Sequence, residues 1–318
     1  MTAAPHTLIA KAKPTPAPIP WDYVARFDDT RDALPGASTP WLAALRARGF
    51  AHFAAAGLPG PRNEEWRYTP LNPLQQADFA LAARSMNGIR PEALPLTVGA
   101  DQAAHRLVFV NGWFRADLSS IEALPAGVDI TTLARAVAER PDLLERRLGS
   151  LAEADGLPMV ALNTAFMSDG VVLRVAPGVV LEKPLVAAFI GDPSDGPVAY
   201  HPRHVLLAEA GSQATIVEHH IGLGQGVYFA NATTEILVEE GAILRHCKIQ
   251  DEAAAAFHLA TTVARVARAG HFDSFVFSLG GRLARNEIRV ELAGEGAGCR
   301  LNGGYLAKGT QHIDNTTV

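Results

Sequence analysis

The sequence contains little cysteine, which limits the metal centres that it can build. Only two of its 318 residues are cysteines, Cys247 and Cys299, so a four-cysteine iron–sulfur or zinc site cannot form within one chain. We expect Cys247, which falls inside a predicted strand, to be a small buried hydrophobic residue, and Cys299, in a glycine-rich turn, to be an exposed thiol. Two unpaired thiols fit a reducing compartment, so we expect a cytoplasmic protein.

The chain also lacks a long apolar run and a large excess of charge. No apolar run approaches the roughly 18 residues of a membrane helix. Residues 1–20 hold two lysines and five prolines but no apolar signal-peptide core, so we expect a disordered arm there. The net charge is −5, with both signs interspersed, which gives no indication of a nucleic-acid partner.

Motifs for phosphate loops, serine hydrolases and zinc proteases are missing as well. The glycine-rich run at residues 222–226 lacks the strand–helix context of a dinucleotide site, so we expect a loop. Eleven histidines are present. His219 and His220 resemble a cupin-type metal pair, but adjacent strand residues point to opposite faces, so at most one can serve a given site. His201 and His204 could meet in a bend; structural histidines remain the default expectation.

A repeated pattern dominates the second half of the sequence. An alternating apolar strand, a glycine and a second strand recur four times between about residues 203 and 318, and the aligned glycines are Gly211, Gly241, Gly270 and Gly296. Their intervals are 30, 29 and 26 residues (241−211, 270−241, 296−270). Such a period indicates stacked units that bury their apolar faces against one another. Hairpins of an antiparallel sandwich are the alternative; the near-constant period favours the coils of a parallel β-helix.

The first half predicts an N-terminal helical and α+β region over residues 21–168. Apolar spacing predicts helices near residues 41–53, 131–151 and 157–167. Residues 106–114 predict a strand that ends in an Asn-Gly hairpin turn. From Val171 onward the apolar period becomes two, so we place the β-helix core at residues 169–318 and expect it to be incomplete at its C-terminal end.

One short segment of the first half combines aromatic and charged residues. It contains Arg62, Glu65, Trp66, Arg67 and Tyr68. The favoured interpretation is structural: the tryptophan packs onto the next layer while an arginine stacks on an aromatic ring or pairs with a carboxylate. The alternative is a partner-binding edge.

Three segments together resemble the SufD family, the non-catalytic scaffold subunits of the SUF iron–sulfur cluster assembly machine. They are residues 62–69 (RNEEWRYT), residues 175–184 (VAPGVVLEKP) and residues 312–316 (HIDNT). The resemblance covers nearly the whole chain in the same order. The first segment is more similar to SufD than to the related SufB, and no SufB-type cysteine motif is present.

The resemblance implies a right-handed parallel β-helix with helical regions on either side. It also implies a scaffold pair with SufB and attachment of the ATPase SufC. The iron–sulfur cluster would then assemble transiently at the complex interface, with no cofactor bound by this chain alone. SufD proteins continue with a Lys-Cys-Ser-His-Gly-like run and a helical tail that grips SufC; neither occurs up to Val318. We therefore assign no cluster ligand and no ATPase-binding residue.

Two alternative functions remain open at this point. A β-solenoid carbohydrate-active enzyme would need clustered acidic or basic side chains on one face, and Arg245 and Asp273 occupy similar offsets in neighbouring repeats. A cupin-like metal enzyme would use His219 or His220, and the antiparallel alternative would permit it.

Overall fold

The repeated units of the sequence stack as coils of a right-handed parallel β-helix. The computed structural model describes residues 21–84, 89 and 104–318. Strands alternate between two sheets, so each strand pairs with strands about one coil away: Ile243 lies opposite Gln213 on one side and His271 on the other. Apart from β2–β3 and β4–β5, the paired strands are parallel. The β-helix prediction is thus confirmed and the antiparallel sandwich is wrong.

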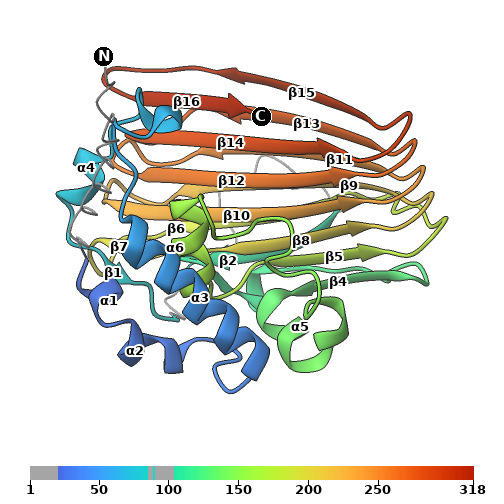
Figure 1. The fold of residues 1–318 in the computed structure, drawn as a ribbon, viewed down its shortest axis with the longest axis horizontal. Coiled ribbons are helices and arrows are strands. Elements are labelled where there is room, and N and C mark those ends of the chain that lie inside the picture. The colour runs from blue at the N-terminus through green and yellow to red at the C-terminus, as the bar shows by residue number, and fades with distance from the viewer. Residues whose placement is uncertain (1–20, 85–88, 90–103) are drawn as a thin grey trace, which may run out of the picture.

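The two sheets form the front and back walls of the β-helix in Figure 1. The first sheet runs in the order β16 (His312–Thr317), β14 (Leu283–Leu292), β12 (Phe257–Val266), β10 (Tyr228–Val238), β8 (Arg203–Ala208), β5 (Val171–Val175) and β4 (Val128–Thr132), with β7 (Val198–Tyr200) and β1 (Ala80–Leu81) at its side. The second runs in the order β15 (Gly298–Tyr305), β13 (His271–Ser278), β11 (Ile243–Asp251), β9 (Gln213–Gly222), β6 (Leu185–Gly191), β2 (His105–Val110) and β3 (Trp113–Phe114).

A column of left-handed residues turns the chain from the first sheet into the second. Gly178, Gly211, Gly241 and Gly296 have φ between +64° and +72°, a conformation that glycine adopts without a steric penalty. The first three of these glycines each donate the backbone N–H to a backbone carbonyl of the next coil at 2.8–3.0 Å. The turns are therefore stacked and hydrogen-bonded along the β-helix.

In one coil this position is occupied by an alanine. Ala269, with φ +53°, has the same offset from β13 that Gly241 has from β11, because Ile243 pairs with His271. The predicted alignment with Gly270 is therefore wrong by one residue. The physical reason is that strand register, and not glycine identity, sets which residue takes the left-handed bend.

The interior between the sheets, which we call the lumen, is apolar where the strands of the first sheet end. Its side chains include Leu206, Ile236 and Ala264 from the first sheet and Ile216, Leu244 and Phe272 from the second. All are at most 1% exposed. Burial on this scale drives the stacking of the coils, since about 25 cal/mol is gained for each Å² of apolar surface removed from water.

Helices cover the outer face of the first sheet (Figure 1). The helical segments are α1 (Asp22–Ala25), α2 (Phe27–Thr30), η1 (Arg31–Ala33), α3 (Pro40–Ala56), η2 (Glu64–Trp66), α4 (Asn72–Gln75), η4 (Ala116–Leu118), α5 (Leu133–Glu139), η5 (Pro141–Leu143) and α6 (Pro158–Phe166). Phe166 of α6 and Phe53 of α3 share one apolar cluster with Phe229 and Phe257 of the sheet. The helices thus close the apolar outer face of the first sheet.

The predicted helix over residues 131–151 is mostly wrong. Thr131 and Thr132 end β4, α5 spans Leu133–Glu139, and η5 and a series of turns follow. Pro141 cannot continue an α-helix, and Gly149 has a φ of +80°. The leucines that follow Pro141 therefore lie in a short 3-10 helix and turns, and not on one face of a continuous α-helix. The helices predicted near residues 41–53 and 157–167, and the Asn-Gly hairpin between β2 and β3, are confirmed.

The β-sheets extend past the predicted boundary at residue 169. β2 pairs with β6 and β4 pairs with β5, so strands of the N-terminal region continue both sheets. The domain division itself stays a prediction, and the predicted disordered arm, residues 1–20, lies outside the described residues.

A buried ion pair connects the N-terminal region to the β-helix. Arg203 of β8 and Glu235 of β10 approach to 2.7 Å and are 0% and 2% exposed at their side chains. The Glu235 carboxylate also accepts the backbone N–H groups of Gly149, Leu151 and Ala152 at 2.8–3.1 Å. One carboxylate therefore holds both a strand arginine and the loop before α6.

Candidate functional site in the β-helix lumen

The lumen becomes polar toward the opposite ends of the strands. We call this region the polar lumen cluster, and its members are at most 4% exposed. The cluster contains His204 (β8), Glu218 and His220 (β9), His246, Lys248 and Gln250 (β11), Glu252, which follows β11, and His258 (β12). Charged and titratable groups are rarely buried unless they are paired or bind a ligand, so this cluster is the main candidate site of the described residues.

Glu218 lies at the centre of one half of the cluster. Its carboxylate lies 3.3 Å from Nε2 of His220 and 3.2 Å from Nε2 of His246, and it accepts a hydrogen bond from the Thr234 hydroxyl at 3.3 Å. Burial alone would raise the pKa of Glu218, but contacts with His220 and His246 hold that pKa well below its usual value. Glu218 is therefore an ionised carboxylate that orients the two imidazoles.

The other half contains two histidines and one carboxylate. One ligand atom each from His220, Glu252 and His258 lies within 4.8 Å of the other two. The Glu252 carboxylate lies 2.8 Å from Nδ1 of His258 and accepts a hydrogen bond from the Gln250 amide at 3.0 Å. The rings of His220 and His258 are 4.6 Å apart, edge to face. Three metal-ligating side chains, two histidines and one glutamate, thus converge on one point of the lumen.

Burial controls the protonation of this cluster. Desolvation, together with the nearby Lys248 ammonium, lowers the pKa of His220 to about 3 and holds the pKa of His258 well below its usual value. Burial also lowers the pKa of Lys248 and raises that of Glu252. Both imidazoles are consequently neutral near pH 7, with one lone pair each.

Sequence analysis missed most of the cluster, although a signal was present. It singled out His204 and His220, but not Glu218, Lys248, Gln250, Glu252 or His258. These residues stand at alternate positions of the strands, and the 30-residue repeat places Glu218 opposite Lys248 and His220 opposite Gln250. An alternating polar pattern is typical of a solvent-exposed face, and only the closed β-helix places it inside.

The predicted motif at residues 62–68 surrounds one buried ring. Trp66, in η2, is 7% exposed, whereas Tyr68 is 79% exposed and Arg62, Glu65 and Arg67 are also exposed. The Arg67 guanidinium lies 5.7 Å from the Tyr68 ring. The five residues are therefore neighbours, but they do not converge on a common site.

The Trp66 ring packs against the C-terminal coils. The Arg285 guanidinium of β14 lies 4.3 Å from the Trp66 ring centre, and Arg285 also pairs with Glu287 at 2.9 Å and with Asp314 of β16. Glu65 pairs with Arg289 of β14 at 2.9 Å. These contacts attach the segment to the β-helix; a role in partner binding stays a prediction.

The two cysteines face opposite sides of the second sheet. Both are free; Cys299 is exposed, and Cys247 is partly buried instead of fully buried as expected. Cys299 lies opposite Phe272, a buried lumen residue, whereas Cys247 lies opposite the exposed Phe275. Because the two thiols point to opposite faces, they cannot bind the same metal ion or cluster.

The histidine pairs noted in the sequence do not form sites of their own. His220 faces the lumen, while the neighbouring His219 lies on the other face of β9, as strand geometry requires. His201 contacts Tyr23 and Asn231 at 3.2 Å, whereas His204 accepts the Val171 N–H at 3.0 Å. A contact between His201 and His204, which the sequence allowed, is not among the contacts of these two described residues. The parallel sheets also remove the basis for a cupin-like enzyme.

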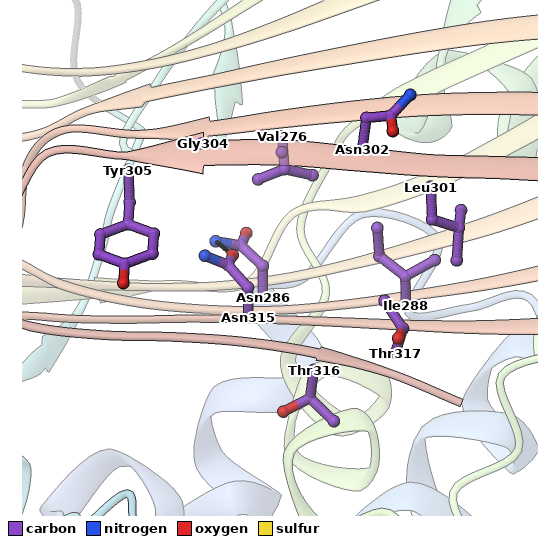
Figure 2. Close-up of a pocket in the computed structure, with 11 residues that line it drawn as sticks. Val276, Asn286, Ile288, Leu301, Asn302, Gly304, Tyr305, Asn315, Thr316 and Thr317 are labelled. Atoms are coloured by element: carbon purple, nitrogen blue, oxygen red, sulfur yellow. Dashed lines mark hydrogen bonds between the residues drawn. The ribbon is translucent and has the colours of Figure 1, made fainter.

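A cavity with an opening lies between β13, β14, β15 and β16. Figure 2 shows Ile288 and Leu301 facing each other across this cavity, with the amides of Asn286 and Asn315 side by side and the Tyr305 ring at one end. The side-chain NH2 group of Asn286 donates a hydrogen bond to the side-chain oxygen Oδ1 of Asn315 at 3.3 Å. The cavity is apolar and amide-lined, with a volume of about 230 Å³.

Comparison with known proteins identifies the family. The SufBD protein N-terminal region matches residues 19–186, and the SufBD core domain of SUF system FeS cluster assembly matches residues 189–318. An iron–sulfur cluster assembly SufBD family protein of Synechocystis is 28% identical over 73% of this chain and 52% of its own length. The iron–sulfur cluster assembly protein SufD of Escherichia coli is 28% identical over 77% of this chain and 55% of its own length.

A chloroplastic protein of Arabidopsis thaliana is 23% identical over 91% of this chain and 60% of its own length. The chain therefore spans little more than half the length of these curated relatives. Among the described residues, no helix is long and apolar enough to cross a membrane. The two matched regions leave only residues 1–18 and 187–188 uncovered, and they follow each other in the order of the fold. This chain belongs to the SufBD family of iron–sulfur cluster assembly proteins.

Proposed function

We propose that this chain is a non-catalytic scaffold for iron–sulfur cluster assembly that acts in the cytoplasm with a SufB partner and the ATPase SufC. Membership of the SufBD family is the observation that carries the proposal, and the relative from Escherichia coli is named SufD. A scaffold functions by docking and has no turnover of its own.

The cysteines support a cluster that is completed by another subunit. Cys299 and Cys247 lie on opposite faces of the second sheet, whereas a cluster requires several thiolates or histidines on the same side. We therefore propose that the cluster is assembled transiently at the interface with the partner, and that this chain alone does not hold it.

The exposed apolar residues on and after β15 offer a docking surface. β15 and β16 stand at the ends of the two sheet orders, and exposed apolar residues lie at and just after β15, including Tyr305 and Leu306, which is 66% exposed. Exposed apolar side chains that lie close together are typical of a surface that binds another protein. We propose that residues 286–318 lie near the SufB partner.

A carbohydrate-active enzyme has weaker support. Arg245 and Asp273 do pair in register on β11 and β13, but one cation and one carboxylate do not supply the two carboxyl groups of glycoside hydrolysis. The scaffold proposal uses the whole fold and the family, so we prefer it.

Co-purification tests the scaffold proposal. The chain, tagged and co-expressed with SufB and SufC, is expected to retain both proteins. A Leu306→Asp variant should retain less SufB, because it places a charge in the proposed docking surface, whereas Ile121→Asp, at an exposed apolar residue elsewhere, should retain the parental amount. Absence of SufB from the parental preparation would contradict the proposal.

A further inference from the structure

We propose that His220, Glu252 and His258 bind one divalent transition-metal ion inside the β-helix. This site goes beyond the scaffold function and departs from the expectation that the chain alone binds no cofactor. Two imidazole nitrogens and one carboxylate oxygen are a recognised protein ligand set for Zn²⁺ and Fe²⁺, with water completing the coordination.

The separation of the three groups suits one ion. Their ligand atoms lie within 4.8 Å of one another. Ligands about 2.1 Å from a tetrahedral ion are roughly 3.4 Å apart, so metal binding requires the ligand atoms to approach one another by up to about 1.4 Å (4.8 − 3.4). The three residues come from β9, from the turn after β11 and from β12, so both walls of the lumen fix the site.

Unpartnered buried atoms of these three residues indicate a missing ligand. Nδ1 of His220, Nε2 of His258 and Oε1 of Glu252 are buried without a hydrogen-bond partner, although buried polar groups are nearly always satisfied. His220 contacts the Glu218 carboxylate through Nε2, which places the proton on that nitrogen and leaves the Nδ1 lone pair free. A metal ion would satisfy these atoms together.

Neighbouring side chains would orient the ligands. Carboxylate–histidine–metal chains are common in metal sites, and Glu218 and His220 supply the first two members of such a chain. The Gln250 amide holds the Glu252 carboxylate at 3.0 Å, and the Phe189 ring stacks on His220 with ring centres 4.9 Å apart. The site therefore has an outer shell that restricts ring and carboxylate rotation.

The local charge leaves room for a cation. Glu218 and Glu252 supply two carboxylates, and the cluster contains one lysine, Lys248, which is buried and lies opposite Glu218 in the register of β9 and β11. The cluster thus contains two carboxylates and one ammonium group, that is, one more carboxylate than ammonium. Nitrogen ligands favour transition metals over Mg²⁺ and Ca²⁺, which prefer sites made only of oxygen.

Metal analysis of the purified protein tests the proposal. The protein is stripped with chelator, dialysed against Zn²⁺ or, under argon, against Fe²⁺, and its metal content is measured by inductively coupled plasma mass spectrometry. We expect about one ion per chain, and X-ray absorption of the zinc form should show two imidazoles in the first shell. A content below a tenth of an ion per chain, or a shell without imidazole, would overturn the proposal.

Variants separate this site from adventitious surface binding. His258→Gln and Glu252→Gln should each lower metal affinity at least tenfold. His201→Gln is the matched control, since His201 is also a fully buried histidine but lies outside the polar lumen cluster, and it should retain the ion. Equal retention by all three variants would overturn the proposal. If a ligand variant does not fold, the absorption spectrum of the unmodified protein still decides.

Discussion

Replacing Glu235 with glutamine tests how the N-terminal region is attached to the β-helix. Arg203 and Glu235 are among the most deeply buried charged residues described, and Glu235→Gln preserves the size of the side chain while removing its charge. The guanidinium of Arg203, 2.7 Å away, would then lose its countercharge but would keep its contacts with Asn163 and Thr164.

The expected loss follows from the burial of the pair. Removing one partner of a buried ion pair costs about 3–5 kcal/mol, because the other charge remains desolvated. The Glu235 carboxylate also accepts hydrogen bonds from three backbone N–H groups, those of Gly149, Leu151 and Ala152. Glutamine has only one side-chain oxygen that can accept such bonds, because its other terminal group is an NH2 donor. Against a total stability of about 5–15 kcal/mol, the variant should lose a substantial fraction of the free energy of unfolding.

Urea unfolding followed by circular dichroism measures this loss. The matched control is Glu291→Gln, which removes a carboxylate paired with Arg265 at 3.4 Å where both side chains are more than half exposed. An exposed pair contributes about 0–1 kcal/mol, so this control should change stability little. Hydrogen exchange should also accelerate at the amides of residues 149, 151 and 152 in Glu235→Gln. Equal losses of less than about 1 kcal/mol in both variants would refute this account of the attachment.

Three further predictions concern the turn column, the Trp66 segment and acid stability. Gly241→Ala should lower the free energy of unfolding by about 1 kcal/mol, because residue 241 has a φ of +64°. Ala269→Gly should leave that free energy unchanged within about 0.5 kcal/mol, since the relief of backbone strain offsets the greater entropy of the unfolded chain. An equal loss of stability for both variants in thermal denaturation would contradict this prediction. Trp66→Ala should cost about 3–5 kcal/mol in a urea titration and Tyr68→Ala within about 0.5 kcal/mol, and equal effects would show that burial of the tryptophan does not stabilise the fold. Burial lowers the pKa of His201 to about 3 in the folded protein, whereas a histidine in the unfolded chain has a pKa of about 6.5. Below about pH 6.5 the unfolded chain therefore binds a proton that the folded protein does not, and the free energy of unfolding should fall by about 2 kcal/mol on acidification to about pH 5. His201→Gln should remove this part of the pH dependence.

The β-helix could be predicted because its period is local in the sequence. Each coil repeats an apolar strand, a bend and a second strand, so the spacing of the bends is visible without any structure. The alignment failed only at Ala269, where an alanine takes the bend and Gly270 follows it. A glycine marks where a left-handed residue is easy, but the strand register decides where it occurs.

The candidate site could not be predicted because it depends on which face is enclosed. Glu218, His246 and Lys248 alternate with other residues as on a solvent-exposed strand, and only the closing of two sheets places them inside. Contacts between distant segments were equally invisible. The partner of Trp66 is Arg285, which lies in β14 and more than 200 residues later in the chain.

The iron and sulfide content of the assembled complex tests the proposed scaffold function most directly. SufB and SufC are co-expressed with this chain or without it, the complexes are purified under argon, and iron and acid-labile sulfide are measured for each SufB. The scaffold account predicts that complexes containing this chain hold more of both and that the chain purified alone holds no sulfide. Equal iron and sulfide with and without the chain would contradict it.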